Sequence, residues 1–287
     1  MKPDRFVLTL DDREYPTCLK ALSDPPKTLY GIGRHELLIE GLGVVGSRKA
    51  TPYGRTAAKI FAGWAAQQGI IIISGAAIGC DQAAHHAALD REGPTVAVLG
   101  CGADIDYPSG AGALLDTIRR DGLVLSELPW GALPKRWAFV RRNRIIAGLS
   151  HALLVVEASL PSGTFSTADF ALDAGRTVCA VPGSIFAPES RGANRLIRQG
   201  ATPVTDVSEL AQALDVPALV RCHAETSLCK ASDDRLVAAL VADPMRPDDI
   251  AREFGMDIVE VVRVLAVLEE RRLARRFPDG RWGCLPM

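Results

Sequence analysis

The chain has 287 residues, of which nearly half are apolar, so it is long enough for one large or two unequal globular domains with a sizeable core. Its formal net charge of −1 excludes nucleic-acid binding through bulk electrostatics and leaves only a local basic patch for such binding. Seven cysteines without framework spacing, and apolar runs too short for a signal peptide or a membrane span, indicate a cytoplasmic protein.

Residues 1–40 are rich in turn signals and poorly periodic, so we expect an irregular N-terminal lead-in. From residue 41 to residue 214, short apolar strands alternate with helical patterns, the first helix at 52–68 being capped by Thr51. The strands are expected at 42–46, 70–73, 95–99, 123–125, 151–156 and 177–181. This alternation predicts an α/β fold with an open, doubly wound parallel sheet that has helices on both faces.

Small or polar residues follow four of these strands. They are Gly46-Ser47-Arg48, Ser74-Gly75-Ala76, Gly100-Cys101-Gly102 and Ser162-Gly163-Thr164. Because the carboxyl ends of parallel strands meet at one edge of a sheet, we expect these loops to converge on one crevice. Their backbone amides could then surround phosphate groups.

The segment 41–46 spells Gly-x-Gly-x-x-Gly, which is also the dinucleotide-binding fingerprint. Its glycines fall in or before the expected strand, however, and not at the turn between strand and helix. The second strand also ends in Ser74-Gly75 and not in the acidic residue that a ribose requires. We therefore expect neither NAD nor any other cofactor.

A cluster of five cations without an acid occupies residues 134–144, and Trp137 and Phe139 lie inside it. The cations are Lys135, Arg136, Arg141, Arg142 and Arg144. A helix is expected at 139–149, followed by the strand 151–156, the Ser162-Gly163-Thr164 loop and a helix at 167–174. Such a cluster can be an ordinary solvated helix face. Together with two aromatic side chains and an anion-binding loop, it favours recognition of single-stranded nucleic acid.

The C-terminal part reads as a linker at 215–231 and a small winged-helix-like domain at 232–287. Helices are expected at 233–241, 247–254 and 257–272, followed by a hairpin that turns at 278–280. From residue 233 onward, nine Lys and Arg face eleven Asp and Glu. A helix that reads DNA would expose cations, so we favour a protein-contacting or accessory role for this domain.

Cys222, His223 and Cys229 could suggest a metal site near the linker. A structural zinc site needs a second pair of ligands, and the sequence offers none at suitable spacing. We therefore expect no metal.

Together the motifs resemble the DNA-processing protein A family. Six matching segments follow one another along the chain. They are Gly-Ser-Arg-x-x-x-x-Tyr-Gly at 46–54, Ser-Gly-x-Ala-x-Gly-x-Asp at 74–81, Leu-Gly-x-Gly-x-Asp-x-x-Tyr-Pro at 99–108, Phe-x-x-Arg-Asn-Arg at 139–144, Ser-Gly-Thr at 162–164 and Val-Pro-Gly at 181–183. The resemblance implies an extended Rossmann-like domain that binds single-stranded DNA, forms homodimers and has no known chemical reaction. It also implies a protein of natural transformation that protects incoming DNA and loads the RecA recombinase onto it.

Carried over by position, Arg48, Arg136 and Phe139 look like the phosphate- and base-contacting residues of that family. The full set of expected DNA-binding residues is Gly46, Ser47, Arg48, Lys135, Arg136, Phe139, Arg142, Asn143, Arg144, Ser162, Gly163 and Thr164. Arg142 and Arg144 point in different directions on a helix, so at most one should face the crevice. Asn143 could instead brace a neighbouring loop, and Phe139 could be a hydrophobic staple at its helix start.

The competing hypothesis is an enzyme that resembles nucleotide phosphoribohydrolases. Those proteins carry Pro-Gly-Gly-x-Gly-Thr-x-x-Glu after the corresponding strand, and here the glutamate position falls at about 167–168, where Thr167 and Ala168 stand. The sequence alone leaves Glu157 open as a substitute carboxylate. We favour a binding protein without a catalytic residue.

Overall fold

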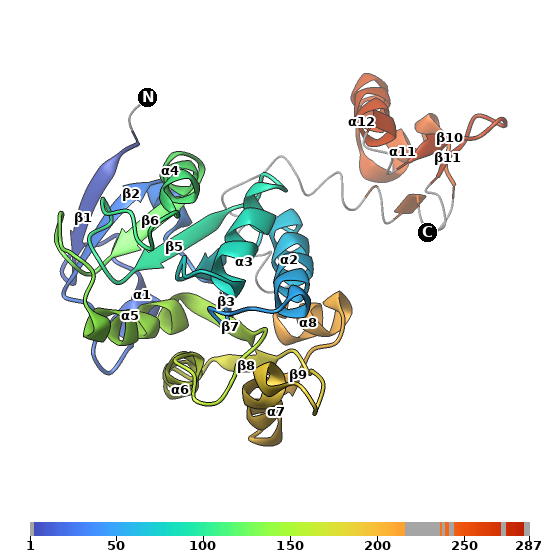
Figure 1. Ribbon diagram of the computed structural model, residues 1–287. Helices are drawn as coiled ribbons and strands as arrows, with labels where there is room; N and C mark the ends of the chain where they lie inside the picture. Colours follow the sequence, from blue (N-terminus) through green and yellow to red (C-terminus); the bar gives the residue numbers. More distant parts are fainter. Residues whose placement is uncertain (1–2, 216–235, 237–238, 241–243, 271–273, 284–287) are drawn as a thin grey trace. The chain divides into compact units, whose positions relative to one another are not determined.

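The computed structural model describes residues 3–215, 236, 239–240, 244–270 and 274–283, drawn in colour in Figure 1. The chain divides into two compact units, Met1–Val220 and Arg221–Met287. Within the described residues, no helix is both long and apolar enough to cross a membrane.

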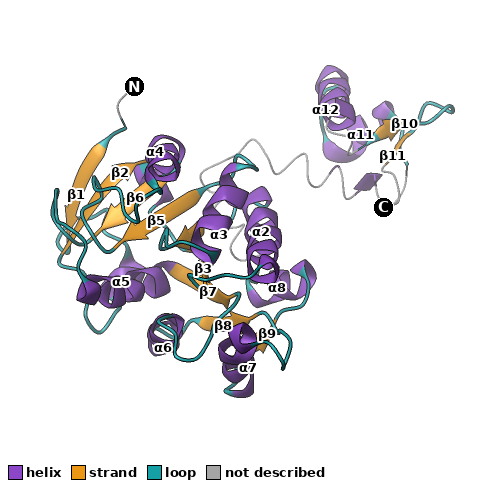
Figure 2. Ribbon diagram, viewed as in Figure 1, coloured by secondary structure: helices purple, strands orange, loops and turns teal. Residues whose placement is uncertain are grey.

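The first unit is built on one nine-stranded sheet with the order β1-β2-β6-β5-β4-β3-β7-β8-β9 (Figure 2). The strands are β1 Arg5–Thr9, β2 Thr28–Gly33, β3 Gly41–Val45, β4 Ile72–Ser74, β5 Thr95–Leu99, β6 Leu123–Ser126, β7 Ser150–Val155, β8 Thr177–Ala180 and β9 Thr202–Pro203. From β6 to β9 every neighbouring pair is parallel. The predicted parallel sheet is therefore confirmed, and β9 adds one more strand at its edge.

The N-terminal segment is not an irregular lead-in but forms two strands of the same sheet. β1 and β2 pair antiparallel, and β2 pairs antiparallel with β6 through residues 30–33. Both strands are only partly buried, and Gly31 and Gly33 interrupt the apolar pattern of β2. A partly exposed strand, or one that glycines interrupt, gives a weak sequence signal, because the continuous apolar run of a fully covered strand is missing.

Helices cover both faces of the sheet, as the doubly wound prediction requires. They are α1 Thr17–Lys20, α2 Pro52–Gln67, α3 Cys80–Leu89, α4 Gly112–Asp121, α5 Arg136–Leu149, α6 Thr164–Asp173, α7 Arg191–Arg198 and α8 Val207–Ala213, with short 3₁₀ turns at His35–Leu37 and Pro188–Ser190. In β7, Ala152 and Leu154 pack toward α2, α3 and α8, whereas Leu153 and Val155 pack toward α1, α5, α6 and α7. Because these strands are parallel, the strand-to-helix turns after β3, β4, β5 and β7 all lie at the carboxyl edge of the sheet.

The second unit contains α11 Pro247–Phe254, α12 Ile258–Glu270 and a two-stranded ribbon of β10 Arg275–Arg276 and β11 Trp282–Gly283. Its core is apolar and is formed by Leu236, Leu240, Ile250, Val261, Leu265, Leu268 and Ala274. The second and third predicted helices and the hairpin are confirmed within two residues. Most of the predicted helix at 233–241, the linker at 215–231 and the Cys222, His223 and Cys229 group lie outside the described residues.

Candidate nucleic-acid interface

The loops after β3, β4, β5 and β7 converge, as expected, on one crevice at the carboxyl edge of the sheet. Its larger part is a cavity of about 390 Å³ between the 45–49 loop, α5 and the 159–167 segment. A smaller cavity of about 150 Å³ reaches toward the loop after β5. The two cavities share Arg48, Ala77, Phe139 and Arg142, so they are parts of one site.

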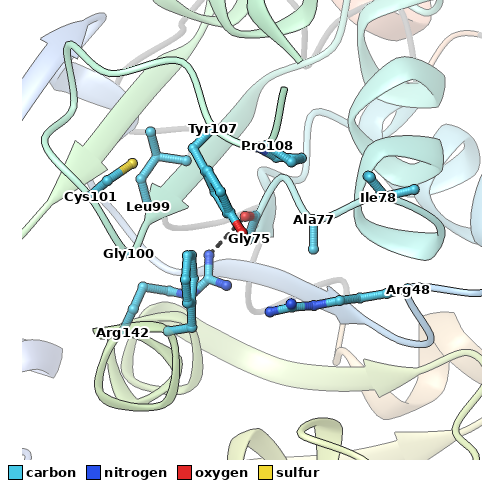
Figure 3. Close-up of a pocket in the computed structure, with 11 residues that line it drawn as sticks. Arg48, Gly75, Ala77, Ile78, Leu99, Gly100, Cys101, Tyr107, Pro108 and Arg142 are labelled. Atoms are coloured by element: carbon cyan, nitrogen blue, oxygen red, sulfur yellow. Dashed lines mark hydrogen bonds between the residues drawn. The ribbon is translucent and has the colours of Figure 1, made fainter. Parts of the chain in front are cut away.

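Arg48 is an exposed cation of this site. It follows β3, and its Cζ atom lies 5.5 Å from the centre of the Phe139 ring. Its loop rests on the start of α3, where Cys80 N donates to Ser47 O over 3.2 Å. Gly79 permits this contact, because its φ of 100° suits glycine and a Cβ there would collide with Ser47 O. Figure 3 shows Arg48 and Arg142 approaching the same space from opposite sides, below Tyr107.

Arg142 forms the buried, charged floor of the site. Its guanidinium donates to Gly75 O over 2.9 Å and to Val98 O. Arg142 is only 4% exposed. Burial lowers the pKa of Arg142 to about 10, although Asp81 opposes this shift. Because that pKa is still far above 7, Arg142 remains positively charged at neutral pH. Gly75 has no Cβ that would displace the guanidinium.

Phe139 and Tyr107 form an aromatic wall beside these cations. Their ring centres are 5.1 Å apart with an angle of 31° between the planes. α5 begins at Arg136 and not at the predicted residue 139, so Phe139 lies in the first helical turn and faces the cavity. It packs closely on Gly100, where a Cβ would come within 2.7 Å of the ring. These contacts do not test the hydrophobic-staple interpretation of Phe139, which stays a prediction.

Lys135 and Arg136 are exposed at the start of α5, outside the two cavities. Arg136 shares one helix face with Val140 and Asn143, because residues four and seven apart lie above one another. Val140 and Asn143 both line the crevice. Arg136 is thus placed to extend the charged surface by one helical turn.

Arg144 does not reach the crevice. Its guanidinium is buried on the opposite side of α5 and donates to Glu127 Oε2 over 2.7 Å and to Asp24 Oδ2 over 3.2 Å. The exposed Arg141 also lies 3.4 Å from Glu127. The expectation that at most one of Arg142 and Arg144 faces the crevice is confirmed. The inclusion of Arg144 among the DNA-binding residues is corrected, because carboxylates already neutralise its charge.

The Ser162-Gly163-Thr164 loop lines the crevice opposite Arg48 and leads into α6, which begins three residues earlier than predicted. Ser162 Oγ accepts from Thr164 N over 3.2 Å, and Gly163 is exposed. Asn143 Nδ2 donates to Ser166 Oγ over 3.0 Å, and Ser166 Oγ donates to Gly163 O. Asn143 therefore braces this loop, as the sequence suggested, and Gly46 and Ser47 lie across the same cavity.

In the loop after β4, hydrogen bonds within the protein occupy the amides of Gly75 and Ala77 and the hydroxyl of Ser74. Gly75 N and Ala77 N donate to the buried Asp81 carboxylate over 3.1 and 3.4 Å, and Ser74 Oγ donates to Val44 O. Burial raises the pKa of Asp81, whereas Arg142 and these two amides lower it. This loop holds the Arg142 guanidinium through Gly75 O, and its amides bind Asp81. Its expected role in binding phosphate through these amides is therefore corrected.

Glu157 is a structural carboxylate at the start of α2. Its oxygens accept from Thr51 N over 2.9 Å and from Thr51 Oγ1 over 2.7 Å, and it is 2% exposed. Gly54 leaves room for it. Within the described residues, no group of three or more His, Cys, Asp or Glu side chains could hold a metal ion.

Comparison with known proteins accounts for both units. The family model described as DNA recombination-mediator protein A matches residues 6–215, which is most of the chain. The chain belongs to this family. A second family model, the DprA winged helix domain, matches residues 226–280 and confirms the winged-helix prediction.

Members of the family resemble the chain over most of its length. Protein Smf of Escherichia coli is 38% identical over 97% of this chain and 77% of its own length. The crystal structure of DNA processing protein A from Streptococcus pneumoniae covers 72% of this chain and 73% of its own, with 38% identity and a TM-score of 0.69. A structure of the Helicobacter pylori protein, described for its single-stranded DNA binding mode, covers 77% of this chain and 99% of its own, with 29% identity and a TM-score of 0.66.

Tyr107 was not predicted as a site residue, although it lies in the Leu-Gly-x-Gly-x-Asp-x-x-Tyr-Pro motif that carries the family resemblance. Ile78 and Pro108 also line the smaller cavity without having been singled out. A usable signal existed, because both residues lie in loops that follow strands and those loops were expected at the crevice.

Proposed function

We propose that the chain binds single-stranded DNA in the crevice at the carboxyl edge of β3, β4, β5 and β7. The observation that carries the proposal is the contact of Arg48 with the Phe139 ring, because it joins a phosphate-binding cation to a base-stacking surface. Arg142 adds a second positive charge at the floor, and Tyr107 extends the aromatic wall. The single-stranded DNA binding mode described for the Helicobacter pylori relative supports the same ligand class.

The shape of the site favours single strands over duplexes. A base can stack on Phe139 or enter the smaller cavity only when it has left its own stack. A duplex would present phosphates to Arg48 but would keep its bases away from the aromatic wall. The site therefore combines a sequence-independent phosphate contact with a base contact that any nucleotide can make.

Binding without turnover is the function we infer, and the phosphoribohydrolase alternative is less well supported. Such a reaction needs a carboxylate that faces the substrate. Thr51 occupies both oxygens of Glu157, and Asp81 accepts two backbone amides. Asp81 is the one acidic residue among those that line the two cavities, and the other charged lining residues are the cations Arg48, Lys49 and Arg142.

The wider role rests on the family resemblance. We propose a cytoplasmic homodimer that protects incoming single strands in natural transformation and loads RecA recombinase onto them. The winged-helix domain, which carries more acids than cations, fits a protein-contacting role better than groove reading.

The salt dependence of binding tests the proposed phosphate contacts. If Arg48, Arg136, Arg142 and Lys135 supply three or four of them, log K against log salt concentration should have a slope of about −2 to −3. Arg48→Ala and Arg136→Ala should each weaken binding to every sequence and flatten the slope by about 0.7.

Arg120→Ala is the matched control, because Arg120 is an exposed arginine paired with Asp121 at the end of α4, away from the crevice. It should leave the slope unchanged. Full affinity and slope in both crevice variants, at unchanged folding, would place the DNA elsewhere on the protein.

A further inference from the structure

We propose that the smaller cavity of the crevice selects nucleobases that carry a carbonyl oxygen at the position where adenine and cytosine carry an amino group. The selecting group is the Arg142 guanidinium, which would donate from Nη2 to that oxygen. The preferred bases are then thymine, uracil, guanine and hypoxanthine. The inference rests on the proposed function, because it concerns a base that has left its stack and entered the same site.

Hydrogen bonds fix the Arg142 guanidinium and leave one of its nitrogens free. Nη1 donates to Gly75 O and Val98 O, and Nε donates to Asn143 Oδ1 over 3.2 Å. Among the described residues, no acceptor is bonded to Nη2, and Nη2 is not one of the partnerless side-chain atoms that are shut off from solvent. Because Arg142 lines the smaller cavity, Nη2 is a donor that opens toward it.

The direction of this donor is set before a ligand arrives. The guanidinium lies against Gly75, where an added Cβ would collide with it. Figure 3 shows its hydrogen bond to Gly75 O and the space that it shares with Arg48, below Tyr107. A donor held in this way loses little conformational freedom on binding, and a hydrogen bond from a charged donor is stronger than one from a neutral donor.

The side chains that line the smaller cavity offer few acceptors to an amino group. Those with polar atoms are Arg48, Arg142, Tyr107 and Cys101, and both arginines are donors only. Burial raises the pKa of Cys101 to about 11, so its thiol stays protonated at neutral pH and accepts only weakly. Asp81 lines the larger cavity but not the smaller one. Among these side chains, the Tyr107 hydroxyl is the remaining acceptor.

Apolar walls increase the difference between the two kinds of base. Ile78, Leu99, Pro108 and the Phe139 ring also line the cavity, so a base that enters it loses water along its polar edge. An adenine amino group opposite Arg142 would then face a cation without an acceptor. The carbonyl oxygen of hypoxanthine would instead accept a charge-assisted hydrogen bond. Every base can still stack on Phe139, so the cavity grades the bases and excludes none.

Strands that carry a single base separate this selection from stacking. We would use strands of about nine nucleotides in which every position except the central one is abasic, so that only one base can enter the cavity. Hypoxanthine and adenine have purine rings of nearly equal area, but one carries the carbonyl oxygen and the other the amino group. The unmodified full chain should bind the hypoxanthine strand about tenfold more tightly than the adenine strand. Uracil should exceed cytosine by only about threefold, because cytosine keeps one carbonyl oxygen.

Arg142→Lys tests whether the guanidinium makes the selection. The lysine keeps the positive charge but has no second nitrogen for the cavity, so the ratio between hypoxanthine and adenine should fall below about two at unchanged helix content. Arg120→Lys is the matched control, because it makes the same exchange at the exposed end of α4, and it should keep the ratio. Tyr107→Phe should also keep the ratio, whatever it does to the affinity. Loss of the ratio in Tyr107→Phe would assign the selection to the hydroxyl and would contradict our proposal, even if Arg142→Lys failed to fold.

The fully abasic strand distinguishes failure of this inference from failure of the proposed function. A ratio below about two between hypoxanthine and adenine in the unmodified protein would overturn the inference. The proposed function would still hold if both strands bound more tightly than the fully abasic strand, because stacking alone gives that result. Arg48→Ala should weaken every strand, including the fully abasic one, and should keep the ratio. If Arg48→Ala weakened none of the strands, the proposed function would fail instead.

Discussion

Arg142→Met is expected to lower the free energy of unfolding of the first unit by about 3 kcal/mol. The substitution keeps an unbranched, flexible stem but removes the buried, charged guanidinium group. Gly75 O and Val98 O would lose their donor, and the buried Asp81 carboxylate would lose its nearest compensating cation. Water cannot easily replace these contacts, because Arg142 is almost fully buried.

Urea unfolding followed by far-UV circular dichroism measures this loss. Arg136→Met on the same helix is the matched control, since Arg136 is exposed, and it should change stability by no more than about 0.5 kcal/mol. A loss below about 1 kcal/mol for Arg142→Met would show that the charge at the floor of the site is not held by these groups.

Phe139→Ala should weaken single-stranded DNA binding by about 1–3 kcal/mol while leaving the salt dependence nearly unchanged. The ring supplies stacking surface but no charge, so its removal releases no further counterions. This combination distinguishes Phe139 from Arg48, whose loss should change both affinity and slope. Fluorescence anisotropy with a labelled oligothymidine at several salt concentrations provides both quantities.

Phe139→Tyr is the conservative control and should keep most of the affinity, because the ring still faces Tyr107 and Arg48. Circular dichroism should show that Phe139→Ala keeps its helix content. If Phe139→Ala bound the strand within a factor of about two of the unmodified protein, bases would not stack on this ring.

The centre of the fold could be predicted from the sequence because its strands are covered on both faces. Such strands are continuous apolar runs, and each of the six predicted strands lies within two residues of the observed one. β1 and β2 were missed for the opposite reason: both strands are partly exposed, and the pairing of β2 with β6 depends on residues about 90 positions away in the sequence.

The position of the site was predictable, but the role of each residue was only partly so. The carboxyl-edge rule led to Arg48 and the Ser162 loop, whereas the cation cluster and the family resemblance led to Phe139. Arg142 and Arg144 have the same chemistry and are two residues apart, so only their surroundings separate a crevice floor from a buried ion pair. Likewise, the sequence does not show that Asp81 occupies the amides of the Gly75 loop, or that Thr51 occupies Glu157.

The central claim is that the crevice at the carboxyl edge binds single-stranded DNA. Its most direct test is a competition experiment in which the full chain, bound to a labelled single strand of about 25 nucleotides, is titrated with the unlabelled strand or with the corresponding duplex at one salt concentration. We expect the single strand to compete at least about tenfold more effectively, because only unstacked bases reach Phe139 and Tyr107. Equal or better competition by the duplex would contradict the account.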